Sequence, residues 1–277
     1  MELFKEEISA FGEYLRCEEK SQATLEKYLR DVNSFCSSLV SAEITKDDVM
    51  NYKRELTGKF KAASVNSHLV AINRFLRFVG KAECCVRLLK IQRQMFTEEE
   101  REMSVEEYKR LIKAAGDARI SYVIQTICGT GIRVSELQYI TVEALKQGKA
   151  VIECKNKTRT IFIPRQVQKL LEKYILKNQI KKGSIFVTRS GKPLNRSNIW
   201  KEMKELCNKA DIPAEKVFPH NLRHLFARIF YNIEKDIIRL ADLLGHSSVN
   251  TTRIYTIESG TKHRKSLEQV NHVLFTT

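Results

Sequence analysis

Six residues in the C-terminal two-thirds of the chain carry side chains that can act together on a phosphodiester. Two guanidinium groups are permanently charged and offer forked donors suited to the non-bridging oxygens of a phosphate. Two imidazoles can donate or carry protons, and a phenol can attack phosphorus once it is deprotonated. With a lysine, the candidates are Arg133, Lys155, His220, Arg223, His246 and Tyr255. Such a site requires no metal ion and no cofactor.

The motifs around these residues are similar to one family at several points. Arg133 lies in G-T-G-I-R-V-S-E-L, His220 and Arg223 lie in H-N-L-R-H, and L-G-H-S-S-V-N-T-T-R-I-Y-T joins His246 to Tyr255. The order and spacing resemble the tyrosine recombinase family, also called the phage integrase family. The resemblance covers nearly the whole chain. It implies a site-specific recombinase, independent of metal and ATP, that cuts and rejoins DNA strands in integration, excision, inversion or resolution.

The resemblance also implies a role for each residue. Tyr255 attacks the phosphodiester to give a 3′-phosphotyrosyl intermediate and a free 5′-hydroxyl. Arg133 and Arg223 neutralise charge on the phosphorus, His220 assists proton transfer and His246 hydrogen-bonds the transition state. Because recombination needs two duplexes and four active sites, the expected partners are double-stranded DNA with short inverted-repeat core sites and three further copies in a homotetramer.

The hairpin lysine is where the chain departs from the family pattern. The family places there a lysine that protonates the leaving 5′-oxygen, with one more residue before the segment that reads N-K-T-R here. Counting backwards therefore reaches Cys154, which cannot be a general acid of that kind. We assign the role to Lys155 with a shortened turn and keep Lys157 as the alternative.

Local alternatives exist for two of these motifs. His220 and His224, four residues apart, could both ligate zinc on one helical face, but Asn221 stands where H-E-x-x-H needs its general-base glutamate. His224 is therefore expected to be structural or a supporting donor. Arg133 could instead cap a helix or pair with Glu136.

The net charge of +15 is unevenly distributed along the 277 residues. Residues 1–100 carry 16 basic and 16 acidic side chains, whereas residues 101–277 carry 32 basic and 17 acidic ones. Such a balance favours the backbone of a nucleic acid, although charge alone is equally compatible with a basic, soluble protein. The basic residues are dispersed rather than gathered on one amphipathic helix, so we expect no membrane partner.

The remaining composition indicates a cytoplasmic, nucleoid-associated protein. Apolar stretches are short, and the first residues, M-E-L-F-K-E-E-I, have neither a basic region nor a long apolar one. Seven cysteines are scattered without a C-x-x-C pair, which predicts reduced thiols.

Hydrophobic periodicity predicts a mainly α-helical chain with two domains. Residues 1–85 read as four helices, the third starting at Thr45 and the fourth running from Ser64 to Gly80. The resemblance implies that this core-binding domain clamps duplex DNA. Its weak contact candidates, which are equally compatible with a solvated face, are Lys61, Arg74 and Arg77.

Residues 86–103 lack a clear buried face and are predicted to be a linker. The catalytic domain, 104–277, is expected to be mostly helical and to contain a small three-stranded antiparallel sheet. Its strands are A-V-I-E-C, T-I-F-I-P and S-I-F-V, and the tip between the first two offers Lys157 and Arg159 as further DNA-contact candidates. Residues 262–277 are predicted to be a tail helix for subunit contact.

Two other functions use related residues. A type IB topoisomerase would relax supercoils with nearly the same site, and joining of two separate DNA sites would distinguish a recombinase from it. A DNA-binding regulator without activity would keep the basic surface and lose catalytic groups, and the full set of six argues against it.

Overall fold

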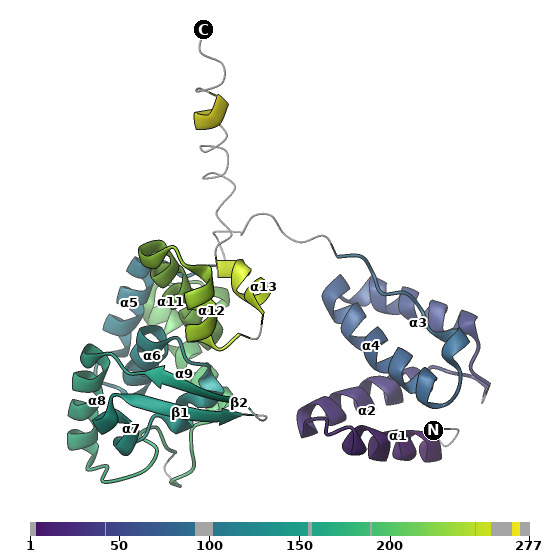
Figure 1. Ribbon diagram of the computed structural model, residues 1–277, viewed down its shortest axis with the longest axis horizontal. Coiled ribbons are helices and arrows are strands. Elements are labelled where there is room, and N and C mark those ends of the chain that lie inside the picture. The colour runs from purple at the N-terminus through teal and green to yellow at the C-terminus, as the bar shows by residue number, and fades with distance from the viewer. Residues whose placement is uncertain are drawn as a thin grey trace. The chain divides into compact units, whose positions relative to one another are not determined.

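The computed structural model describes residues 4–41, 43–91, 102–154, 157–188, 190–246, 248–255 and 268–271. The chain divides into two compact units, 1–93 and 94–277 (Figure 1). Both consist mainly of helices, and the second also holds a small antiparallel sheet. No helix among the described residues is long and apolar enough to span a membrane.

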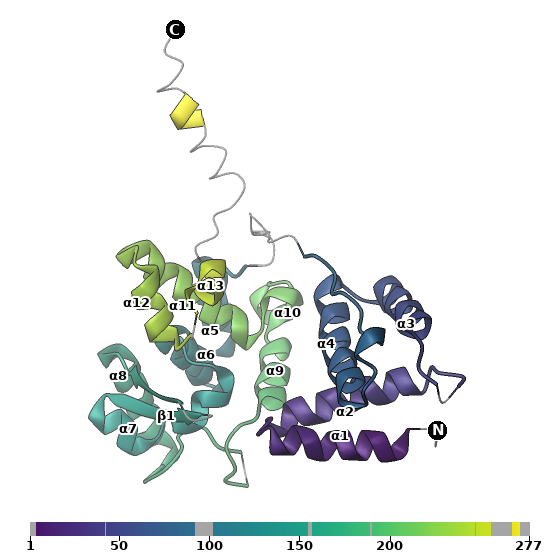
Figure 2. The same ribbon diagram turned by 45° about the vertical axis from the view of Figure 1, so that its right-hand side comes forward.

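The N-terminal unit contains four α-helices in its described residues. They are α1 (Lys5–Cys17), α2 (Gln22–Cys36), α3 (Lys46–Lys59) and α4 (Ala62–Phe78), followed by the 3-10 turn η1 (Ala82–Cys84). Helices α1 and α2 lie side by side, with α3 and α4 above them in both views (Figure 2). Their apolar stripes meet in one core, where the rings of Phe11 and Phe75 pack edge to face with centroids 5.4 Å apart.

Helix starts in this unit follow the sequence signals. The capping box predicted at Thr45 is present, because its hydroxyl accepts from the Asp48 N–H while the Asp48 carboxylate accepts from the Thr45 N–H. Helix α4 begins at Ala62, two residues before the predicted start at Ser64.

The predicted linker begins too early. Val86 is buried, and the Asn73 side chain holds both of its backbone groups, accepting from the N–H at 3.0 Å and donating to the C=O at 2.8 Å. Asn66 makes the same pair of bonds with Leu89, at 2.7 and 2.9 Å. Two asparagine side chains of α4 thus bond the backbone of this segment as a neighbouring strand would. The N-terminal unit therefore continues past residue 85.

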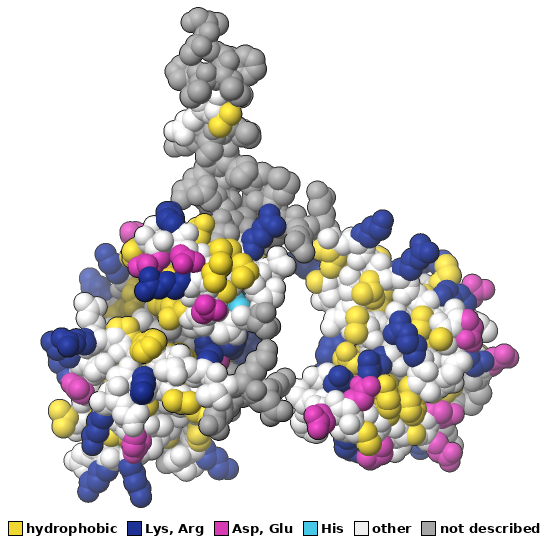
Figure 3. Space-filling model, in the orientation of Figure 1, with side chains coloured by type: hydrophobic (Ala, Val, Ile, Leu, Met, Phe, Trp, Pro, Cys, Tyr) yellow, Lys and Arg dark blue, Asp and Glu magenta, His cyan; other side chains and the backbone are white. Residues whose placement is uncertain are grey.

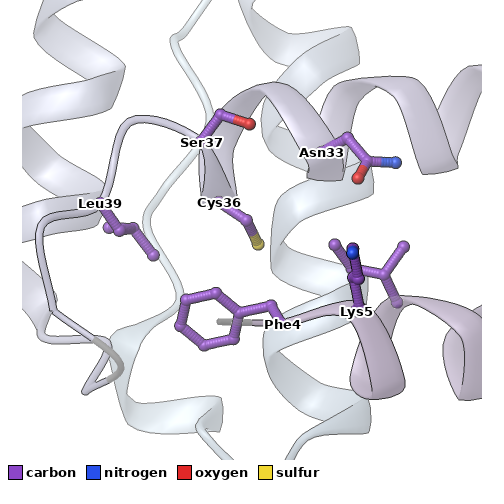
Figure 4. A pocket seen from close by; sticks show the side chains of 7 residues that line it. Phe4, Lys5, Asn33, Cys36, Ser37 and Leu39 are labelled. Atoms are coloured by element: carbon purple, nitrogen blue, oxygen red, sulfur yellow. The ribbon is translucent and has the colours of Figure 1, made fainter. Parts of the chain in front are cut away.

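A small cavity of about 80 Å³ lies between the start of α1 and the end of α2 (Figure 4). Phe4, Cys36 and Leu39 form much of its wall. Burial, reinforced by the charge of Glu7, raises the pKa of the Cys36 thiol to about 12. The thiol therefore stays protonated and serves as packing.

The C-terminal unit is built around α6 and α11, which pack against each other. Its first elements are α5 (Val105–Ala115), α6 (Arg119–Thr130), η3 (Val134–Tyr139), α7 (Val142–Gln147), β1 (Lys149–Cys154), β2 (Lys157–Phe162) and α8 (Arg165–Asn178). The rest are α9 (Arg196–Glu205), α10 (Cys207–Ala210), η4 (Ala214–Lys216), α11 (Pro219–Glu234), α12 (Ile237–Leu244), α13 (Val249–Thr252) and η5 (Arg253–Tyr255). In Figure 1 the β1–β2 hairpin lies below α6, whereas α12 and α13 lie above α6.

The sheet in the described residues has two strands, not the predicted three. Strands β1 and β2 pair antiparallel, with Cys154 opposite Lys157 at the end near the turn. The expected third strand, 184–187, forms only isolated bridges, and its two central residues, Ile185 and Phe186, are both buried. A strand directs successive side chains to opposite faces, so this segment fills the core between connections instead of extending the sheet.

The tail helix predicted for 262–277 lies mostly outside the described residues. Of that range, residues 268–271 are described, and they form one exposed helical turn.

Replacing Asn73 should loosen the end of the N-terminal unit. Asn73→Ala leaves the buried N–H and C=O of Val86 without partners, at a cost of about 1–3 kcal/mol. We expect faster hydrogen exchange at the Val86 amide in the full-length protein, measured by NMR. Asn33→Ala, which removes an exposed side-chain bond to Leu29, is the matched control and should leave that amide unchanged. Equal exchange in both variants would contradict the anchoring role.

Candidate active site

A buried guanidinium lies at the centre of the candidate site. Arg223, one turn into α11, is 2% exposed. It donates to the Gly131 carbonyl, to the Leu244 carbonyl at 2.7 Å, and lies 3.1 Å from His246 Nε2. Tyr255 interacts with it electrostatically and stacks on the His246 ring. Arg223 thus lies where α6, α11, the end of α12 and Tyr255 converge.

Two glycines end the helices that converge on this guanidinium. Gly131 ends α6 at φ +66° and Gly245 ends α12 at φ +63°, in the left-handed region that favours glycine. A Cβ at Gly131 would lie 2.4 Å from the Phe226 ring, and one at Gly245 would lie 2.5 Å from Arg159 Cδ. Both turns therefore require glycine for conformation and for space.

A second cluster is organised by one carboxylate. The Glu136 side chain is 8% exposed, accepts from the Arg133 backbone at 2.7 Å and from Arg133 Nη1 at 3.0 Å, and also pairs with Arg159. Arg159 in turn donates to the Leu243 carbonyl at 3.0 Å, and Arg133 Nη2 lies 3.4 Å from the Gly245 carbonyl. The cluster therefore ties η3, the hairpin and the end of α12 together.

The pairing of Arg133 with Glu136, considered as an alternative from the sequence, is thus present. It is compatible with a role toward phosphate, because the Arg133 side chain remains 41% exposed. Glu136 orients the guanidinium while leaving part of it accessible.

The last segment stacks the candidate nucleophile on a histidine. Tyr255 is 4% exposed, and its ring lies parallel to His246 with centroids 6.0 Å apart. His246 Nδ1 lies 2.8 Å from the hydroxyl of Thr252, which has no exposed surface. The rings of His224 and Tyr255 pack edge to face, with centroids 4.7 Å apart. The rings of His224 and His246 therefore flank the phenol.

His220 stands at the rim of this cluster. Pro219 occupies the first turn of α11, where its missing N–H costs nothing, and His220 follows it and is exposed. Its ring packs edge to face on His224 at 4.5 Å. The described residues contain no group of three or more His, Cys, Asp or Glu that could hold a metal ion.

Positive charge shapes the titration of the site. Burial first, and then the charges of Arg223 and Arg133, lower the pKa of His246 to about 4. Partial burial and the charge of Arg223 also lower the pKa of His220. Burial and the charge of Arg133 lower the pKa of Arg223 to about 10, partly opposed by Tyr255. At neutral pH the site therefore holds neutral imidazoles beside charged guanidiniums.

Of the six predicted residues, the structure brings five together. Arg133, His220, Arg223, His246 and Tyr255 belong to these linked clusters, whereas Lys155 lies outside the described residues. Lys157 begins β2, and its side chain is not described.

The predicted DNA-contact residues divide into inward and outward ones. Arg159 points into the protein, and Arg74 is bound to Glu18 and to the Tyr14 hydroxyl. Lys61, at the start of α4, is exposed, and so is Arg77 in its last turn. Basic side chains are spread over the visible faces of both units rather than gathered in one patch (Figure 3).

Thr252 and the bridging role of Glu136 were missed by sequence reasoning. The signals were present, since Glu136 follows Arg133 by one turn and Thr252 precedes Tyr255 by three residues. A hydrophobic pattern does not predict which hydroxyl groups are buried, so the role of Thr252 became visible only through its contact with His246.

Comparison with known proteins places the chain among phage integrases. The model of the phage integrase family matches residues 101–261, and that of the phage integrase N-terminal SAM-like domain matches residues 8–83. Tyrosine recombinase XerA of Pyrococcus furiosus is 29% identical over 281 residues, covering 97% of this chain and 95% of the relative. Tyrosine recombinase XerH of Campylobacter jejuni is 35% identical over 167 residues, covering 56% and 47%.

Two solved structures share the fold. The crystal structure of XerA recombinase has a TM-score of 0.54 at 28% identity, covering 95% of this chain and 97% of that one. A lambda integrase dimer bound to a core site has a TM-score of 0.74 at 18% identity, covering 90% and 93%.

Neutralising Glu136 should destabilise the C-terminal unit. Glu136→Gln removes a buried charge between two arginines, which should cost on the order of 3 kcal/mol. Urea unfolding followed by fluorescence of Trp200, the single tryptophan, reports on this unit. Glu205→Gln, an exposed site on α9, should unfold like the wild type.

The same comparison has a defined pH dependence. Burial raises the pKa of Glu136, but bonds from Arg133 and the charge of Arg159 outweigh it and hold the pKa below the ordinary 4.5. A depressed pKa stabilises the folded state above pH 4.5, and this contribution is lost as pH falls through the folded value. The difference in the free energy of unfolding between wild type and Glu136→Gln should therefore shrink below pH 4.5. A difference that stays constant with pH would contradict the ionic role of Glu136.

Proposed function

The chain belongs to the phage integrase family and is a site-specific tyrosine recombinase that cuts and rejoins DNA, and on that premise we propose that Tyr255 is its nucleophile. The observation that supports this assignment is the position of Tyr255, which is buried against the rings of His224 and His246 beside the guanidinium of Arg223. A fixed positive charge beside the phenol oxygen stabilises the phenolate that attack on phosphorus requires. The attack joins Tyr255 to the 3′-phosphate and releases a 5′-hydroxyl.

The scissile phosphate is held by Arg133 and Arg223. Arg133 keeps part of its guanidinium exposed, so a phosphate oxygen can reach it without rearrangement. Arg223 is enclosed, and Tyr255 is 4% exposed, so DNA binding must open the η5 segment. Once the phosphate is seated, two guanidiniums offset the charge that grows on the phosphorane oxygens.

The histidines move and share protons. Because their pKa values are lowered, both His220 and His246 are neutral at about pH 7 and can accept or donate a proton. His220, at the rim of the site, assists proton transfer from the phenol. His246, stacked on the Tyr255 ring, donates a hydrogen bond to a non-bridging oxygen.

The leaving 5′-oxygen receives its proton from the hairpin. Strands β1 and β2 pair as far as Cys154 and Lys157, and Lys155 follows β1 in the sequence. An ammonium group next to β1 in the sequence, in the same unit as the arginines, fits a general acid. Lys157, at the first position of β2, is the alternative.

Assembly on DNA follows from the chemistry. Exchange between two duplexes needs four nucleophiles, so the active species is a homotetramer on core sites with short inverted repeats. A lambda integrase tetramer bound to a Holliday junction is similar in fold to this chain, with a TM-score of 0.73 at 18% identity. The N-terminal unit, with Lys61 and Arg77 exposed at the two ends of α4, clamps the duplex in the cytoplasm, on the nucleoid.

Tyr255→Phe should abolish covalent attachment and spare binding. Duplexes selected from a random pool for binding to the protein supply the core site, which is then nicked to trap the intermediate. Wild type and the control Tyr231→Phe should form a protein–DNA adduct, whereas Tyr255→Phe should bind within about threefold of wild type and form none. An adduct in Tyr255→Phe, or one mapped to another tyrosine, would refute the assignment.

Bridging phosphorothiolate DNA should identify the general acid. A 5′-thiolate leaves without a proton, whereas a 5′-alkoxide needs one. Lys155→Ala should therefore be slow on normal DNA, by about 100-fold or more, and recover on the phosphorothiolate. Lys157→Ala should change little on either substrate. Rescue of Lys157→Ala instead would move the role to that residue, and rescue of neither would exclude both.

A further inference from the structure

Thr252 is the buried polar side chain of the site to which the proposed chemistry assigns no role. It has no exposed surface, and its Oγ1 lies 2.8 Å from Nδ1 of His246. It ends α13, three residues before Tyr255. A buried hydroxyl on one ring nitrogen controls which proton the other nitrogen can carry.

The contacts of His246 in the structure define one tautomer of its ring. Nε2 lies 3.1 Å from Arg223 Nη2, and a guanidinium has donors but no acceptor. Nε2 must therefore accept, which leaves the proton of the neutral ring on Nδ1. The Nδ1–H then donates to Thr252, whose hydroxyl acts as acceptor.

The reaction needs the opposite arrangement, and the role inferred for Thr252 therefore rests on the proposed function. When Arg223 turns its Nη2 toward phosphate, Nε2 loses its donor, and to bond a phosphate oxygen it must itself carry a proton. Nδ1 must then accept. A backbone carbonyl or a carboxylate at that position would accept only, whereas a hydroxyl can also donate.

We propose that Thr252 is a positioning residue that holds the His246 ring in both tautomers, as acceptor from Nδ1–H in the free enzyme and as donor to Nδ1 when Nε2–H binds the scissile phosphate. The ring keeps one proton throughout. Nδ1 releases a proton to water, Nε2 takes one from water, and the Thr252 hydroxyl rotates. No bond between heavy atoms changes, and the His246 ring keeps its contact with the Thr252 hydroxyl through Nδ1.

Three variants test the hydroxyl in single-turnover cleavage of the selected core site. Thr252→Val keeps the shape but leaves Nδ1 without a partner, so cleavage should fall about 10- to 100-fold at unchanged DNA affinity. Thr252→Ser restores the hydroxyl and should stay within about threefold of wild type. Thr251→Val, at the exposed neighbouring position, is the matched control. Unfolding midpoints from Trp200 fluorescence verify that each variant is folded.

Nitrogen-15 NMR of the histidine rings tests the tautomers themselves. His246 signals, assigned by their loss in His246→Asn, should show a protonated Nδ1 in the free wild type. In the uncleaved complex of Tyr255→Phe with core DNA they should show a protonated Nε2. A purely structural threonine would produce no such exchange.

Each outcome decides the proposal. Wild-type rates in Thr252→Val, a Thr252→Ser variant as slow as Thr252→Val, or the same tautomer with and without DNA would each overturn it. If wild-type protein forms no covalent adduct, the proposed function fails instead. The tautomer of the free protein remains measurable in that case, so the two failures are distinguishable.

Discussion

The site depends on burying the guanidinium of Arg223 among the ends of helices. Its acceptors, the carbonyls of Gly131 and Leu244, belong to the last turns of α6 and α12, where the helix leaves carbonyls without partners and carries partial negative charge. Each helix end stabilises the cation, and the cation satisfies each helix end. Because the bond to Gly131 joins segments 92 residues apart, the same interaction that assembles the fold also places a charge beside Tyr255.

Excess positive charge is the second constraint. Two arginines, Arg133 and Arg159, pair with the one carboxylate of Glu136, and Arg223 adds a further charge, so the cluster is cationic and suited to a phosphodiester anion. Burial, reinforced by the same charge, keeps His246 neutral by lowering its pKa. Neutral histidines are versatile because each nitrogen can change between donor and acceptor. The cluster therefore combines charges that cannot titrate with rings that can exchange protons.

Local signals in the sequence predicted the features that depend on residues close together in the chain, such as helix starts. The capping boxes at Thr45 and at Ser104 follow from residues three apart, and both are present. Contacts between distant residues were not predictable in this way. Asn73 replaces a strand partner for Val86, and Arg159, expected at a basic tip, turns inward because Glu136 and the end of α12 supply acceptors.

The five proposed site residues within the described part of the chain were predicted from side-chain chemistry, spacing and the resemblance to a family, while the residues that support them required the fold. The prediction of a third strand was wrong for a related reason, since Ile185 and Phe186 are both buried. An apolar run indicates burial but not whether backbone partners lie beside it.

Cleavage of DNA with a methylphosphonate at the scissile position tests most directly whether the arginines act by neutralising phosphate charge. This substitution removes the negative charge that a guanidinium would offset and leaves the leaving group unchanged. Arg133→Ala should be inactive on the normal phosphate and should cleave the methylphosphonate at a rate near that of the wild type. Equal loss of cleavage on both substrates, with the protein folded, would mean that Arg133 serves the structure rather than the charge of the reaction.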